Sequence, residues 1–129
     1  CDAGGIYSDV VDPRFNTVGQ KFLRGNQTTD ANGSVRFRTI YPGWYQGRAT
    51  HIHLEVTIGG VSRKVTQIAF PESINDTVHR SGAYASRGTN ALSNARDGIF
   101  ADSLASEIVT PAGDPTGGYA ATFQVGIAL

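Results

Sequence analysis

The sequence predicts an all-β domain, and three observations support that expectation. Short apolar runs with a period of two residues are separated by turn signals, among them residues 30–33, Pro42-Gly43 and Gly59-Gly60. Glycine is abundant, at 16 of 129 residues, and Ser, Thr and Asn are also frequent, as in chains rich in tight turns. The length suits one domain with one core, so we expect residues 1–129 to form a single unit.

The first predicted strands follow from the alternation of apolar and polar residues. Residues 34–41 alternate in this way and end at Pro42-Gly43. Residues 51–58 alternate most clearly, with one apolar face and one polar face. The Gly59-Gly60 turn then predicts a hairpin, in which residues 61–70 pair back as the next strand.

The second half of the chain is less regular. Residues 72–100 are expected to be a long loop with one short helical turn near residues 73–78, and such loops are usually functional or pack as a lid. His79 lies in this loop and is expected to be a solvated residue. Further strands are expected at residues 104–109 and at residues 119–127.

Composition and charge exclude several classes of function. Basic and acidic residues balance at eleven each, so the chain has no electrostatic reason to bind nucleic acid or an anionic membrane. No apolar run approaches the ~20 residues that a membrane-spanning helix needs. The chain starts at Cys1 and contains no Met, so we expect that an upstream N-terminal segment is missing from it. Asn-x-Ser/Thr triplets at Asn26, Asn32 and Asn75 favour export, and we expect a secreted protein.

A His-x-His pair is the first sign of chemistry. His51 and His53 leave the same face of their predicted strand, roughly 7 Å apart along it, so their rings can converge on one metal ion. Alone, such a pair is more often two polar residues on the wet face of an edge strand. Tyr45 precedes His51 by six residues, and a phenolate is an anionic oxygen ligand that favours Fe(III) over Fe(II) or Zn(II). The other reading of Tyr45 is an aromatic side chain that packs on a loop.

Four separated segments carry a resemblance to a known family. They are residues 37–53 with FRTIYPGWY and GRATHIH, residues 1–8 (CDAGGIYS), residues 65–70 (VTQIAF), and residues 94–100 together with Gly118-Tyr119. These segments, which extend over nearly the whole chain, resemble the intradiol ring-cleavage dioxygenases, and in particular the short, secreted branch of that family. The resemblance implies an antiparallel β-sandwich with long irregular loops, in which a metal is held on strand ends and loops.

The same resemblance implies a site and a reaction. It implies a non-haem iron(III) centre with four ligands: Tyr7, Tyr45, His51 and His53. It also implies that Tyr45 is the displaceable ligand and that Arg48 and Gln67 act beside the substrate ring. Tyr41, Trp44 and Tyr84 are candidates for the lining of the substrate pocket. The implied reaction uses O₂ to cleave catechol-type rings between the two hydroxyl-bearing carbons, giving cis,cis-muconate-type diacids.

The resemblance to this family also leads to expectations about substrates and partners. Lignin- or plant-derived catechols are the expected substrates of a secreted member, and a polymer-binding module, attached or separate, is a candidate partner. Neither nucleic acid nor a membrane is an expected partner.

Two other classes of function remain open on the residues alone. The first is a non-catalytic carbohydrate-binding β-sandwich, in which exposed aromatic residues such as Trp44 stack on sugars. The second is a zinc hydrolase that uses the histidine pair with a carboxylate such as Glu55 or Asp12. Neither class gives the tyrosines a role.

Overall fold

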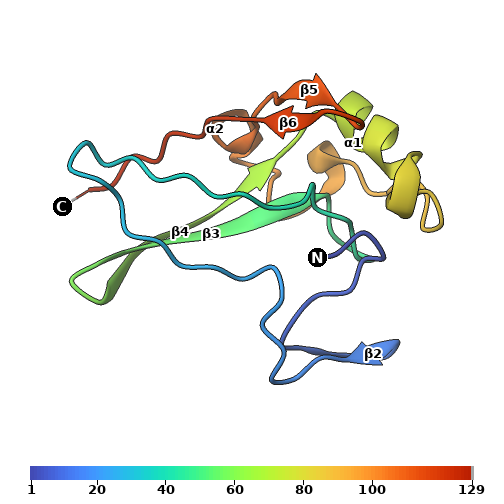
Figure 1. Cartoon of the computed structure of the whole chain (residues 1–129), viewed down its shortest axis with the longest axis horizontal. Coiled ribbons are helices and arrows are strands. Elements are labelled where there is room, and N and C mark those ends of the chain that lie inside the picture. The colour runs from blue at the N-terminus through green and yellow to red at the C-terminus, as the bar shows by residue number, and fades with distance from the viewer. Residues whose placement is uncertain (129) are drawn as a thin grey trace.

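The centre of the molecule is a long antiparallel hairpin of β3 (His51–Ile58) and β4 (Val61–Ala69). It is seen in a computed structural model that describes residues 1–128 (Figure 1). The pairing runs from His51 opposite Ala69 to Ile58 opposite Val61, with an irregularity between Val56 and Thr57. Gly59 and Gly60 both have positive φ, +59° and +79°, as a tight hairpin turn requires. Both predicted strands and their turn are therefore confirmed.

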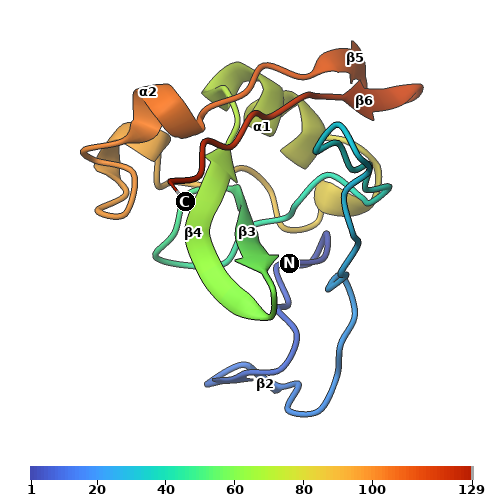
Figure 2. The same ribbon diagram turned by 90° about the vertical axis from the view of Figure 1, so that its left-hand side faces the viewer.

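The remaining strands are short and lie at two ends of this hairpin. β1 (Val11–Asp12) and β2 (Phe15–Asn16) form one antiparallel pair, and β5 (Ala112–Asp114) and β6 (Gly118–Ala120) form another. Figures 1 and 2 place the first pair on one side of the central hairpin and the second pair on the opposite side, near α1. Within residues 1–128 the strands thus form three separate two-stranded sheets. The chain is mostly β with small antiparallel sheets, as expected, whereas two packed sheets of a sandwich are not shown.

Three predicted strands differ from the structure. Residues 34–41 have no strand partner, and the side chains of residues 31–40 are exposed, so their alternation has no neighbour to supply ladder hydrogen bonds. Of residues 119–127, only the first two belong to β6. The strand predicted at residues 104–109 is instead the short helix α2 (Leu104–Glu107).

The physical reason for α2 is the spacing of its apolar residues. Leu104 and Ile108 are four residues apart, and the Ile108 amide donates to the Leu104 carbonyl at 3.0 Å. Leu104 packs against the small core of Ala49, Ala69 and Phe100. Ile108 then forms an isolated parallel bridge with Ala69, so the chain is extended only after this turn.

The segment after β4 is more ordered than a loop. It contains the helix α1 (Glu72–His79) and the 3₁₀ turns η1 (Gly82–Tyr84) and η2 (Asn94–Arg96). The helical turn predicted near residues 73–78 is confirmed. The expectation that His79 is solvated is wrong: it is 1% exposed, and its Nε2 lies 3.3 Å from the Pro42 carbonyl. The helix directs this residue inward, against the segment that leads to Tyr45.

Buried polar residues connect residues 72–97 to the end of β4 through hydrogen bonds. The Asn75 and Asn94 side-chain amides both donate to the Phe70 carbonyl, at 3.1 and 2.7 Å. Asn94 also donates its backbone N–H to the Glu72 carboxylate at 2.5 Å. Because buried amides are costly when they lack partners, this network fixes the course of residues 70–97 over the hairpin. None of the helices described in residues 1–128 is long and apolar enough to cross a membrane.

Candidate metal centre

Three rings from three separate segments meet at the start of β3. The centroids of the Tyr7 and Tyr45 rings are 6.0 Å apart, with an angle of 41° between the ring planes. The centroids of Tyr45 and His51 are 5.9 Å apart in an edge arrangement at 69°. All three side chains are half-buried. Two phenol rings and an imidazole ring therefore lie close together, and we consider their oxygens and nitrogen as one candidate donor set.

The His51 ring is oriented by its own backbone neighbourhood. Its Nδ1 lies 2.7 Å from the Ala49 carbonyl, which can only accept a hydrogen bond, so Nδ1 carries the proton in the neutral ring. This leaves Nε2 with a lone pair available to a metal, the arrangement usual for metal-binding histidines. Burial lowers the pKa of His51 to about 4, and the nearby Arg48 cation acts in the same direction. The imidazole is thus neutral at neutral pH.

His53 is placed by the register of the strand. It lies two residues after His51 on β3, so both side chains leave the same face. It pairs across the hairpin with Gln67 on β4, and its side chain is exposed. The histidine pair therefore stands at the paired end of a regular strand, which gives both rings a rigid support.

The donor types limit which metal the site suits. Within residues 1–128, no group of three or more His, Cys, Asp or Glu side chains could together hold a metal ion. Glu55 and Asp12 form no such group with the histidines, and Asp12 is instead paired with Arg14 at 2.9 Å. A metal bound here would need the tyrosine oxygens. Two phenolates with two imidazoles fit an oxidised, hard cation such as Fe(III) better than Zn(II).

Arg48 is held beside this donor set by contacts from both sides. Its Nε donates to Asp97 Oδ2 at 2.9 Å, and its other guanidinium nitrogen donates to Gln67 Oε1 at 2.5 Å. Gln67 lies opposite His53, so the two residues expected to act near a substrate are in direct contact next to the histidines. The guanidinium carbon also lies 6.0 Å from the centroid of Phe100.

Asp97 anchors this arginine and was not singled out as a site residue from the sequence. It is 1% exposed and also accepts the amide hydrogens of Ala49 and Ile99, at 2.7 and 2.8 Å. Burial alone would raise the pKa of Asp97, but these hydrogen bonds and that from Arg48 outweigh it, so the pKa lies below its usual value. Asp97 is therefore a carboxylate, and it gives Arg48 a fixed orientation.

The two tyrosine segments are joined by close backbone contacts. Gly43 donates its N–H to the Cys1 carbonyl at 3.2 Å, and a Cβ at Gly43 would lie 1.9 Å from the Asp2 carbonyl oxygen. Gly5, with φ of +79°, approaches Trp44 so closely that a Cβ would lie 2.2 Å from the Trp44 carbonyl oxygen. Glycine is required at both positions because no side chain fits. The two segments therefore pack as one unit, which brings Tyr7 to Tyr45.

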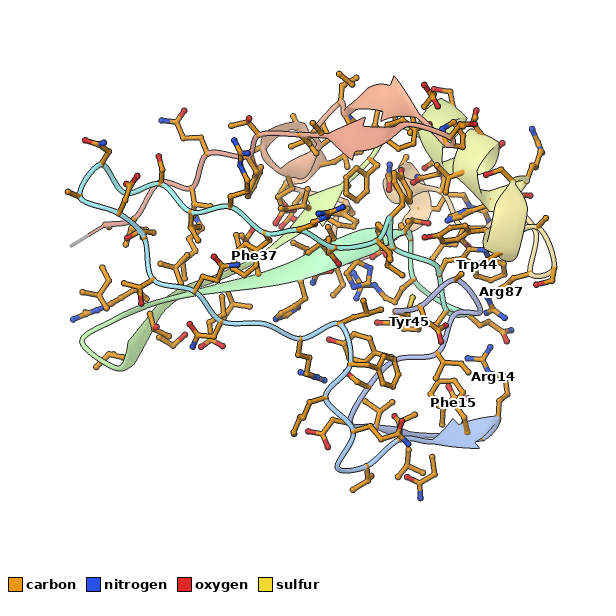
Figure 3. All side chains as sticks on the ribbon, in the orientation of Figure 1. Arg14, Phe15, Phe37, Trp44, Tyr45 and Arg87 are labelled. Carbon is orange, nitrogen blue, oxygen red and sulfur yellow. The ribbon has the colours of Figure 1, made fainter. Side chains whose placement is uncertain are left out.

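The residues predicted to line a substrate pocket, Tyr41, Trp44 and Tyr84, form hydrogen bonds around the segment that carries Tyr45. The Tyr41 hydroxyl donates to Asn75 Oδ1 at 2.7 Å, and the Tyr84 hydroxyl donates to the Tyr41 carbonyl at 2.6 Å. Trp44 donates its ring N–H to the Gly88 carbonyl at 2.8 Å, and the Arg87 guanidinium lies 4.0 Å from its ring centroid. Figure 3 shows Trp44 and Arg87 together near Tyr45. All three residues support the Tyr45 segment, and their role in a pocket stays a prediction.

One further residue next to the tyrosines had no signal in the sequence. The guanidinium carbon of Arg24 lies 5.0 Å from the centroid of the Tyr7 ring. Arg24 also donates to the Ser8 hydroxyl and to the Ser8 carbonyl, both at 2.8 Å. Because 16 residues without a long regular element separate Tyr7 and Arg24 in the chain, no periodicity could have predicted this contact.

Comparison with solved structures shows that the fold of this chain is similar to that of two structures described as dioxygenases. A structure described as an intradiol ring-cleavage dioxygenase from Tetranychus urticae superposes with a TM-score of 0.86 at 30% sequence identity. A second, described as the crystal structure of a dioxygenase, also has a TM-score of 0.86 and 30% identity. Each superposition covers 98% of this chain but 66% of the other, so the chain spans slightly less than two thirds of their length. No protein-family model and no curated protein matches the sequence.

Proposed function

Since the chain belongs to the intradiol ring-cleavage dioxygenase family, we propose that it is an iron(III) enzyme that cleaves catechol-type rings with O₂. The products would be cis,cis-muconate-type diacids, formed by breaking the bond between the two hydroxyl-bearing carbons. The observation that carries the proposal is the meeting of the Tyr7, Tyr45 and His51 rings beside the His53 position. The proposal includes the β-sandwich of this family as the wider architecture around the β3–β4 hairpin.

The proposed metal ligands are Tyr7, Tyr45, His51 and His53. Iron(III), when bound, would withdraw electron density from the catechol oxygens and orient the ring. The two tyrosines act as phenolates and the two histidines as neutral imidazoles, for which the low pKa of His51 prepares that residue. Tyr45 is the proposed acceptor of one catechol proton, which its phenolate oxygen takes up when the substrate arrives.

Arg48 and Gln67 are the proposed residues that act on the substrate ring. Arg48 is a permanent cation and can stabilise negative charge that develops on the ring and its oxygens. Gln67 accepts a hydrogen bond from one nitrogen of Arg48, and Asp97 accepts one from another. Such a cation does not have to reorient as charge develops, which is the basis of electrostatic stabilisation in a transition state.

The experiment that tests the proposal combines colour with oxygen uptake. Ferric iron bound by tyrosinate gives a wine-red protein, so the purified chain loaded with ferric iron should absorb in the visible range and consume O₂ when catechol is added. Tyr45→Phe and His53→Ala should each reduce both signals. Tyr119→Phe is the matched control, because Tyr119 packs on Tyr41 and lies outside the donor set. A chain that stays colourless and inactive after ferric loading would refute the proposal.

Export and substrate source are further parts of the proposal. We propose a secreted enzyme that acts on lignin- or plant-derived catechols, alone or beside a polymer-binding module. The exposed Asn26 and Asn32 can accept N-linked glycans, whereas Asn75 is 2% exposed and its amide is hydrogen-bonded. A polypeptide mass without glycan on protein taken from its native source would remove that support for export.

A further inference from the structure

A tight turn at residues 30–34 closes the long loop that precedes the Tyr45 segment (Figure 1). The Asp30 N–H donates to the Ser34 carbonyl at 2.8 Å, and the Gly33 N–H donates to the Asp30 carbonyl at 3.0 Å. The Asp30 carboxylate also accepts the backbone N–H groups of Asn32 and Ser34, both at 2.9 Å. These hydrogen bonds fix the backbone of the turn, although every residue in it is exposed.

The two arms of this turn depend on it for their arrangement. In the part of the chain that the structure describes, residues 25–29 and residues 35–40 form no hydrogen bonds through backbone or side chain. The arms approach each other where a Cβ at Gly25 would lie 3.9 Å from the Phe37 ring. Within this loop, the turn therefore supplies the hydrogen bonds that hold the two arms together.

Asn32, inside the turn, differs from the other asparagines in two respects. Its side chain is exposed and forms no hydrogen bond within residues 1–128, whereas the amides of Asn75, Asn90 and Asn94 donate to backbone carbonyls. It is also followed by glycine, which is true of no other asparagine in the chain. Its side-chain amide is thus free to react, and the next residue leaves room for a reaction.

Glycine at position 33 leaves the backbone nitrogen open to the side chain of Asn32. Gly33 has a φ of +76°, and nothing lies within 4 Å of the place that a Cβ would occupy. A bond between the Gly33 nitrogen and Asn32 Cγ closes a five-membered ring, and no side chain of residue 33 stands in its way. The exposed Asn26 has the same freedom, but Gln27 follows it and carries a side chain at that point.

We propose that Asn32 is a site of spontaneous covalent modification, which converts it to aspartate or isoaspartate with loss of ammonia. The Gly33 nitrogen loses its proton to hydroxide and bonds to Asn32 Cγ, the bond from Cγ to Nδ2 breaks, and Nδ2 takes up a proton and leaves as ammonia. Water then opens the cyclic imide. Attack at Cγ gives aspartate, and attack at the backbone carbonyl gives isoaspartate, in which the main chain runs through Cγ. Water is the only reactant consumed, and nothing is oxidised or reduced.

Isoaspartate at this position would open the turn. It adds one atom to the backbone between residues 32 and 33, so the N–H groups of Gly33 and Ser34 no longer face the Asp30 oxygens that accept them. Aspartate leaves the length of the backbone unchanged. The isoaspartate product should therefore release the two arms, whereas the aspartate product should keep them together.

The reaction also competes with the proposed glycan at Asn32, because both use Nδ2. A glycan attached to this nitrogen replaces one of its hydrogens, so ammonia can no longer leave. Chains glycosylated at Asn32 should keep their mass during incubation, whereas unglycosylated chains change. Equal rates in both would overturn the assigned leaving group.

The test follows the mass of one peptide in the full-length chain, produced without glycans. The protein is incubated at neutral and at mildly alkaline pH and then digested with trypsin. Cleavage after Arg24 and Arg36 gives the peptide of residues 25–36, which contains both Asn26 and Asn32. We expect a mass increase of about 1 Da, located at residue 32 by fragmentation, with isoaspartate among the products. Hydroxide removes the Gly33 proton, so the increase should be faster at alkaline pH.

Gly33→Ala is the variant that isolates the ring closure, and Gly25→Ala is its matched control. Both changes add one methyl group to the same peptide, and a Cβ at Gly25 makes only an ordinary contact, 3.9 Å from the Phe37 ring. Gly33→Ala should slow the mass increase several-fold, whereas Gly25→Ala should leave it unchanged. Equal modification of Asn26 and Asn32, or equal rates in Gly33→Ala and the wild type, would overturn the proposal.

Limited digestion of the folded protein tests the opening of the turn. Arg36 and Arg38 are exposed on one arm, so brief treatment with trypsin reports how freely that arm moves. Incubated protein should be cleaved there faster than fresh protein. Asn32→Asp should be cleaved at the rate of fresh protein, because it gains the charge without the longer backbone. Equal rates in fresh and isoaspartate-containing protein would show that the turn does not open.

Discussion

Arg48 and Asp97 are 49 residues apart in the chain and form a hydrogen-bonded ion pair, with Arg48 Nε donating to Asp97 Oδ2 at 2.9 Å. The same carboxylate oxygen accepts the amide hydrogen of Ala49 at 2.7 Å. Asp97 therefore binds both the side chain of Arg48 and the backbone next to it. The pair links the end of the long segment after α1 to the start of β3, which carries His51.

Replacing Asp97 by Asn should weaken both the fold and the site. The change leaves the Arg48 cation half-buried without its carboxylate, and loss of one partner from such a pair costs roughly 3 kcal/mol. We expect a corresponding decrease in the free energy of unfolding, measured by urea denaturation, and a decrease in kcat that exceeds any change in KM. Asp102→Asn, at an exposed position, is the control and should leave both quantities unchanged. Wild-type stability in Asp97→Asn would contradict the assigned role.

The stability of the iron-free protein should decrease as the pH falls below neutrality. Burial lowers the pKa of His51 to about 4, whereas the unfolded chain has a histidine pKa near 6.5. Between these two values the unfolded state binds more protons than the folded state, so the free energy of unfolding falls with falling pH and levels off near pH 4. The loss from this residue is at most about 3 kcal/mol. It is measured by urea denaturation at several pH values with a chelator present.

His51→Gln is the control for that pH dependence. Glutamine does not titrate, so the variant should lose less stability than the wild type between pH 6.5 and pH 4. The pKa of Asp97 is also below its usual value, and its contribution is lost only at lower pH, as the carboxylate takes up a proton. Parallel curves for the wild type and His51→Gln over pH 6.5 to 4 would show that His51 is not the cause.

Gly43→Ala should separate the two tyrosine segments. The added Cβ would lie 1.9 Å from the Asp2 carbonyl oxygen, so one of the two segments must move. We expect a loss of at least about 2 kcal/mol in the free energy of unfolding and a weaker ferric-tyrosinate absorption, because Tyr7 and Tyr45 would no longer meet. Gly98→Ala is the matched control, since nothing lies within 4 Å of a Cβ at that position. Equal absorption in both variants would argue against a shared support for the tyrosines.

Tyr41→Phe should destabilise the fold by about 1 kcal/mol and leave iron binding unchanged. The substitution removes the hydrogen bond to Asn75, a 2% exposed residue whose Oδ1 would then lack this partner. Thermal unfolding followed by circular dichroism measures the loss. The ferric absorption of the loaded protein tests whether Tyr41 also contacts the metal centre, which the geometry does not support.

Strong local signals account for what could be predicted from the sequence. Alternation over residues 51–58 and two adjacent glycines were sufficient to predict the β3–β4 hairpin, and its register places His53 opposite Gln67 and His51 opposite Ala69. The strand predicted at residues 34–41 also alternates but has no partner strand to pair with. An alternating pattern alone does not make a strand, because the hydrogen bonds of a sheet require a second strand beside the first.

The contacts around the donor set could not be predicted, because they join residues that are distant in the chain. The role of Asp97 depends on the path of a segment whose course is fixed by buried amides such as Asn75 and Asn94. The burial of His79 has the same origin, because the helix directs it toward Pro42. Neither Asp97 nor His79 belongs to a periodic pattern of apolar residues that would indicate its burial.

The contact of Gly43 with Asp2 has a consequence for how the proposed iron would bind. Because backbone atoms hold the two tyrosine segments together, the polypeptide fold itself brings the Tyr7 and Tyr45 rings close to each other. Loading should then require no folding transition, and the iron-free and iron-loaded proteins should have the same secondary structure. The affinity of the site would depend on deprotonation of the tyrosines and not on ordering of the chain, so metal uptake should become tighter as the pH rises.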